Sequence, residues 1–165
     1  MKDDAGRKPD ASLREHLAKL LDWKDAHATF DAAVEGIAPE DRGKVPEGAP
    51  HSLWQLVEHL RLAQHDILDF CVNAGYEEPD WPDDYWPQPD PPSAEAWDES
   101  LAGYREDRAR AIALANDASV DLHVRIPHGA GQTVLRELLL IADHNAYHIG
   151  QIVLIRKLLG RWPAS

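Results

Sequence analysis

Apolar residues recur at three- and four-residue steps in four stretches of the chain, a spacing that places them on one face of an α-helix. The predicted helices run from Ser12 to Gly36, from Ser52 to Gly75, from Ser93 to Asp117 and from Thr133 to Leu159. The first two begin with a serine followed three positions later by Glu or Gln, which is the capping pattern of a helix N-terminus. The stripe of the third is the weakest.

The fourth stretch is apolar around nearly its whole circumference, so we expect it in the middle of the fold. No stretch shows a convincing alternating strand pattern, although residues 119–132 could hold a short extended pair. A chain of 165 residues is about one domain long. We therefore predict a single all-α domain over residues 1–165, a four-helix bundle preceded by a flexible polar tail at residues 1–10.

A long crossover loop is predicted between the second and third helices. Residues 76–92 read YEEPDWPDDYWPQPDPP and contain half of the twelve prolines together with Trp81, Tyr85 and Trp86. Proline supplies stiffness and the aromatic rings supply area, so we expect the loop to pack over one end of the bundle. An ordered cover of the core is the favoured interpretation, and a substrate lid is the alternative.

Charge, cysteine content and hydropathy argue against nucleic-acid-binding, membrane-spanning and exported proteins. The formal net charge is −12 and no basic stripe is present, so a nucleic-acid partner is not expected. Cys71 is the single cysteine, which fits a buried thiol in a reducing compartment and a cytoplasmic location. Polar residues interrupt the longest apolar run, residues 138–155, and the N-terminus lacks a secretory pattern, so we expect neither a membrane span nor export.

Two histidines, His144 and His148, stand four residues apart in the fourth predicted helix and therefore share one face. His59 can point inward from the second helix, whereas His65 points away. Three imidazoles are the number that a catalytic zinc-type site uses, and zinc and nickel are the metals we expect first. The alternative is ordinary core or capping histidines. Asn145 occupies the position of the zincin general-base Glu, so peptide hydrolysis is disfavoured.

Further candidates surround this pattern. His27 lies in the apolar stripe of the first helix, where core packing is expected and a proton carrier beside the site is the alternative. Glu137 and Gln151 lie seven residues on either side of His144 and could orient a ligand or contact substrate. Tyr147 could present its phenol to the pocket, or it could simply pack against neighbouring side chains. The remaining histidines are expected at the surface or in turns: His51, His123 and His128.

Two segments, HSLWQLVEHL and IPHGAGQTVLRELLLIADHNAYHIGQIVLIRKLLGRWP, resemble the DinB-like superfamily, which includes YfiT-like metal-dependent hydrolases and thiol-dependent transferases. The resemblance extends from the first helix to Pro163. It implies a four-helix bundle in which one His of the second helix and an HxxxH pair on the last helix hold a metal. The matching positions here are His59, His144 and His148. Some relatives use a low-molecular-weight thiol such as bacillithiol, mycothiol or glutathione, and the resemblance names no substrate.

These observations give two competing functions. The first is a metal-dependent enzyme that transfers a low-molecular-weight thiol to a small electrophile or hydrolyses a small substrate, with an open metal position beside a pocket lined by Trp23, Tyr147 or Trp86. The second is a non-catalytic metal-binding or stress-related interaction protein, whose site a fourth ligand such as His27 would close. The histidines could also bind nothing. We expect a small-molecule substrate as partner and, because relatives pair, a homodimer.

Overall fold

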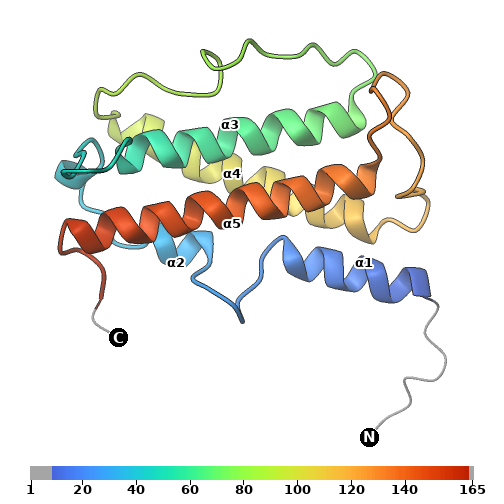
Figure 1. The fold of residues 1–165 in the computed structure, drawn as a ribbon, viewed down its shortest axis with the longest axis horizontal. Helices are drawn as coiled ribbons and strands as arrows, with labels where there is room; N and C mark the ends of the chain where they lie inside the picture. Colours follow the sequence, from blue (N-terminus) through green and yellow to red (C-terminus); the bar gives the residue numbers. More distant parts are fainter. Residues whose placement is uncertain (1–8, 164–165) are drawn as a thin grey trace, which may run out of the picture.

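The computed structural model describes residues 9–163, which form an all-helical fold (Figure 1). It contains the helices α1 (Pro9–Leu20), α2 (Phe30–Val34), η1 (Pro39–Asp41, a 3-10 turn), α3 (Leu53–Val72), α4 (Ala94–Asn116) and α5 (Val134–Leu158). The predicted all-α class is confirmed. The described residues contain no strand, and the extended pair expected at residues 119–132 is reduced to one bridge between Arg125 and Thr133. The predicted tail lies outside the described residues except for Pro9 and Asp10, which begin α1.

The first predicted helix, residues 12–36, is divided in two, so that prediction is wrong. The helix α1 ends at Leu20, and α2 begins at Phe30 after an irregular connection. Thr29 ends this connection as an N-cap, because its hydroxyl accepts a hydrogen bond from the Ala32 amide at 3.2 Å. Phe30 is fully buried and stacks on Tyr104 of α4. The apolar stripe therefore marks Leu17 and Phe30 correctly as buried, although His27 of the same stripe is exposed and the backbone between them is not helical throughout.

The other three predicted helices are present, with ends that differ by at most a few residues. Side-chain caps explain their starts. Ser52 and Gln55 form a reciprocal capping box at α3, and Ser93 and Thr133 cap α4 and α5. Gly160 follows α5 with a positive φ of 68°, which a glycine adopts without steric cost.

The helix α3 packs against both α4 and α5, and α5 contacts every other α-helix (Figure 1). α5 is long and apolar enough to cross a membrane by length and composition, a criterion that the central helix of a globular protein also meets. One side of α5 is uncovered, which departs from the expected fully enclosed helix. The exposed apolar side chains on it are Leu139, Tyr147, Leu154 and Leu158.

The segment of residues 73–93 joins α3 to α4 and runs alongside α3 (Figure 1). It contains turns but no helix or strand. Its acidic residues are exposed, whereas Tyr76, Tyr85 and Trp86 are half-buried. These three aromatic side chains therefore attach the segment to the helices.

Candidate metal centre

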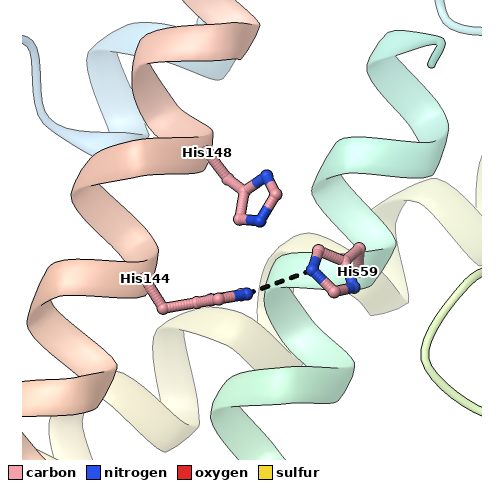
Figure 2. Close-up of side chains that lie close together, drawn as sticks. All are labelled: His59, His144 and His148. Carbon is pink, nitrogen blue, oxygen red and sulfur yellow. Dashed lines mark hydrogen bonds between the residues drawn. The ribbon is translucent and has the colours of Figure 1, made fainter. Parts of the chain in front are cut away.

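Three imidazoles meet between α3 and α5. His59 comes from α3, and His144 and His148 come from successive turns of α5, all pointing toward one another (Figure 2). Their ligand nitrogens lie within 4.8 Å of one another, and the two Nε2 atoms of His59 and His144 are 3.0 Å apart. Nitrogens bound tetrahedrally to one zinc ion are roughly 3.3 Å apart, since each Zn–N bond is about 2.0–2.1 Å. Small ring rotations would thus place the three nitrogens around one cation.

Hydrogen bonds determine which nitrogen of two rings faces the cluster. His59 Nδ1 lies 2.9 Å from the carbonyl oxygen of Tyr85, which can only accept, so Nδ1 carries the proton. His148 Nδ1 lies 2.8 Å from Gln151 Oε1 and donates in the same way. Both rings therefore keep an unprotonated Nε2. Metal-binding histidines characteristically donate their other N–H to a carbonyl or carboxylate, as these two do to a backbone and an amide oxygen.

His144 differs from the other two histidines. Its Nε2 donates to the unprotonated Nε2 of His59, while its Nδ1 is buried and has no hydrogen-bond partner. Two nitrogen lone pairs at this distance repel each other, so either a proton or a cation must lie between them. A cation bound by both nitrogens would take the place of this proton.

Two buried amides next to the histidine cluster link the helices to one another. Asn145 Nδ2 donates to Gln64 Oε1 at 2.8 Å, and Gln64 Nε2 donates to the carbonyl of Tyr104 at 2.8 Å. Because this carbonyl can only accept, the orientation of both amides is fixed and Asn145 Oδ1 is turned away from Gln64. Asn145 Oδ1 is buried without a hydrogen-bond partner beside the equally unpartnered Nδ1 of His144. The two amides thus join α4, α3 and α5 next to the histidine cluster.

The environment favours neutral imidazoles. Burial lowers the pKa of His59 to about 4, and the nearby rings of His148 and His51 act in the same direction while the Tyr85 carbonyl opposes them. Burial and the two neighbouring imidazoles lower the pKa of His144 to about 4, against a smaller opposing effect of Asn145. Burial also lowers the pKa of His148. At neutral pH all three rings are uncharged, which is the form that binds metal.

Aromatic residues form one wall of the cluster. The indole of Trp86 stacks on His59 with ring centroids 3.9 Å apart and planes only 4° from parallel. His51 stacks on Trp86 at 4.0 Å, although its position before a helix cap predicted a surface or turn residue. Tyr147 touches the edge of His148 at 4.9 Å, yet 64 % of the residue is exposed. Trp86 and Tyr147 therefore both contact the cluster, Trp86 as a packed wall and Tyr147 at the surface.

His27 and Trp23 lie elsewhere. His27 is exposed, not packed in the core, and its Nδ1 contacts the adjacent Ala28 carbonyl. The prediction of a core position fails because the chain leaves the helix after Leu20. Both residues line a cavity of about 260 Å³ between the α1–α2 connection, α4 and a different face of α5. His27 is thus not a fourth ligand, and no carboxylate or thiol from residues 9–163 joins the three histidines.

Other candidates are likewise outside the cluster. Glu137 is buried and paired with Arg136, so it does not orient a ligand. His65 is exposed as predicted and pairs with Asp107 of α4. Cys71 is half-buried, and burial raises the pKa of its thiol to about 12, so the thiol is not a nucleophile at neutral pH.

A family model described as the DinB superfamily matches residues 22–152. The chain belongs to the DinB superfamily. The match covers most of the chain, including all three histidines, and begins after α1. Neither a curated protein nor a solved structure showed significant similarity to the chain. Membership in the DinB superfamily confirms the resemblance, and together with the clustering of His59, His144 and His148 it favours metal binding.

Proposed function

We propose that the protein is a metal-dependent enzyme in which His59, His144 and His148 hold one divalent cation, with zinc or nickel as the first choices. The observation that carries this proposal is the convergence of three imidazoles on one point, two of which, His59 and His148, present an unprotonated Nε2. Membership in the DinB superfamily supports it. In this proposal the fold is a four-helix bundle in which α1 and α2 together take the place of one helix, and residues 73–93 are its long crossover.

His59, His144 and His148 would hold the divalent cation as neutral ligands, and a water or thiol bound to it would have its pKa lowered enough to lose its proton near neutral pH. The chain's own residues orient the ligands and limit access. Tyr85 and Gln151 hold two of the rings, and Trp86 covers the face of His59. Tyr147 is the exposed phenol at the cluster, so it is the residue placed to contact a substrate.

The substrate is a small molecule in this proposal. We favour transfer of a low-molecular-weight thiol to a small electrophile over hydrolysis, a preference that rests on the superfamily. Residues 62–104 contain eleven Asp or Glu and no Lys or Arg, and they include the segment that covers His59. Such a field repels anions. The charge of a bound divalent cation opposes this field, so the acidic segment does not by itself favour a neutral thiol over an anionic thiol such as glutathione.

The experiment is a screen of thiols with electrophilic acceptors, using protein loaded with zinc or nickel. The proposal expects turnover that chelation removes and that His148→Ala lowers by at least 100-fold. Thiol-dependent turnover that is equal in the wild type, the variant and the chelated protein would contradict it.

A second candidate function is a non-catalytic metal-binding or interaction protein, and the uncovered side of α5 favours it. Leu139, Leu154 and Leu158 are each about half exposed on the uncovered side of α5. Exposed apolar side chains along one face are typical of an interface, and a homodimer through α5 is the simplest form. Analytical ultracentrifugation tests this: a monomer at micromolar concentration would contradict the homodimer.

A further inference from the structure

We propose that Asp66 is a positioning residue for the metal centre. It anchors residues 76–86 on α3 so that the carbonyl of Tyr85 holds His59 with its Nε2 toward the cluster. This inference rests on the proposed metal site, but its first test does not require a metal.

The anchor is a carboxylate with two phenol donors. Asp66 lies seven residues after His59, two helical turns along the same face of α3. Tyr76 donates its hydroxyl to Asp66 Oδ1 and Tyr85 donates its hydroxyl to Asp66 Oδ2, both at 2.7 Å. Hydrogen bonds from a hydroxyl to a carboxylate are among the strongest in proteins. Burial and the bonds to Asp66 raise the pKa of both tyrosines, so both stay protonated as donors.

Tyr85 connects this anchor to the metal ligand. Its hydroxyl end is fixed on Asp66, and its carbonyl accepts the Nδ1 proton of His59 at 2.9 Å. The next residue, Trp86, stacks flat on the same imidazole. A planar ring that is held at Nδ1 and covered on one face has little freedom to turn. Its Nε2 consequently stays directed at His144.

The segment has no helix or strand, and residues 77, 78, 80–84 and 88–91 are exposed. Its other attachments include ring contacts of Tyr76 with Phe70 and of Trp86 with His51. The Asp66 carboxylate is the group that fixes the Tyr85 hydroxyl, so it sets where the Tyr85 carbonyl lies relative to His59. Within this proposal the segment is a fixed wall of the site and not a lid that opens in each catalytic cycle.

The first test measures the tautomer of His59 in metal-free protein by nitrogen-15 NMR of the imidazoles. The wild type is expected to show His59 protonated at Nδ1, and Tyr85→Phe and Asp66→Asn are expected to populate the Nε2-protonated form. Tyr76→Phe is the matched control, because it removes a bond of the same length to the same carboxylate from a residue that does not contact His59. A His59 tautomer that is the same in wild type and Tyr85→Phe overturns the proposal.

The second test measures zinc and nickel affinity by competition with a chelator. Tyr85→Phe is expected to weaken binding by about 10- to 100-fold, the usual effect of losing a group that orients a metal ligand, and Tyr76→Phe by less than about threefold. In a His59→Ala background Tyr85→Phe should have no further effect, whereas in a His148→Ala background its effect should persist. A wild-type affinity for Tyr85→Phe, or an equal loss in the His59→Ala background, overturns the proposal. Wild-type protein that binds no metal overturns the proposed function instead, and the tautomer comparison then decides the positioning role alone.

Discussion

Replacing Gln64 by leucine should destabilise the protein through an unsatisfied amide, because Gln64 is 1 % exposed and both ends of its amide are hydrogen-bonded. In Gln64→Leu the buried Nδ2 of Asn145 loses its acceptor, at a cost of about 1–3 kcal/mol, and the bond to the Tyr104 carbonyl is lost, at about 1 kcal/mol. The apolar leucine offsets part of this. We expect a net loss of about 1–3 kcal/mol, equivalent to a fall in Tm of roughly 2–12 °C at this chain length.

The double variant Gln64→Leu/Asn145→Leu tests the reasoning most sharply. Asn145→Leu alone leaves Gln64 Oε1 without its donor and should cost about as much as Gln64→Leu. Replacing both partners by apolar groups leaves neither amide unsatisfied, so the double variant should lose only about 0–2 kcal/mol. The two effects are then strongly coupled, whereas independent sites would add.

The assay is urea unfolding of chelator-treated protein, with the free energy of unfolding obtained by linear extrapolation. A control at an exposed amide is Asn73→Ala, which removes the hydrogen bond that Asn73 donates to Asp69 and the one that it accepts from the Gly75 amide, and should cost less than about 1 kcal/mol. Additive losses in the double variant would refute the account of Gln64 and Asn145 as one buried unit.

Three further outcomes follow from the same structure. Metal-free protein should lose stability as the pH falls from 6.5 to about 4, because the pKa values of His59 and His144 are about 4 in the folded protein and the unfolded chain binds protons first. The free energy of unfolding should fall by up to about 1.4 kcal/mol per pH unit for each ring. His59→Ala should reduce this slope in urea titrations at a series of pH values. Phe30→Ala removes a fully buried ring stacked on Tyr104 and should cost about 3–5 kcal/mol, so a loss below 1 kcal/mol in thermal unfolding would contradict the packing of α2. Lys44 and Arg161 donate to Asp41 and hold the pKa of this carboxyl below its usual value despite burial. The carboxylate therefore stabilises the fold above pH about 4 and ceases to do so as the pH falls further. Asp41→Asn should destabilise the protein at pH 7 and have little effect at pH 2.

Local signals made α3, α4 and α5 predictable. Ser52, Ser93 and Thr133 each provide a side-chain acceptor where a helix begins. Because a cap is a contact within the first turn of the helix itself, it marks the start independently of tertiary packing. The pair His144 and His148 was predictable for a similar reason, because four residues along a helix return to the same face.

The break between α1 and α2 was not predictable from the apolar stripe. Leu17 and Phe30 are both buried as the stripe requires, but periodicity identifies buried positions and not the continuity of the backbone. His27 was misplaced for this reason, since it was assigned to a helix face that does not exist there.

The surroundings of His59 depend on a segment without periodicity. The contacts of Tyr85 and Trp86 with His59 join residues 26 and 27 positions apart, and no local spacing predicts them. Their aromatic and proline-rich composition indicated packing but not the partner. Asp66, at seven residues from His59 on the same helix, was the available signal for the anchor.

The metal content of protein purified without an affinity tag tests the central claim most directly. After loading with zinc or nickel and removal of free metal, the wild type should retain about one divalent cation per chain, and His148→Ala should retain far less. His65→Ala, which removes an exposed histidine on α3 outside the cluster, should retain as much metal as the wild type. Equal metal in the wild type and His148→Ala, or none in either, would contradict the claim that the three imidazoles share one cation.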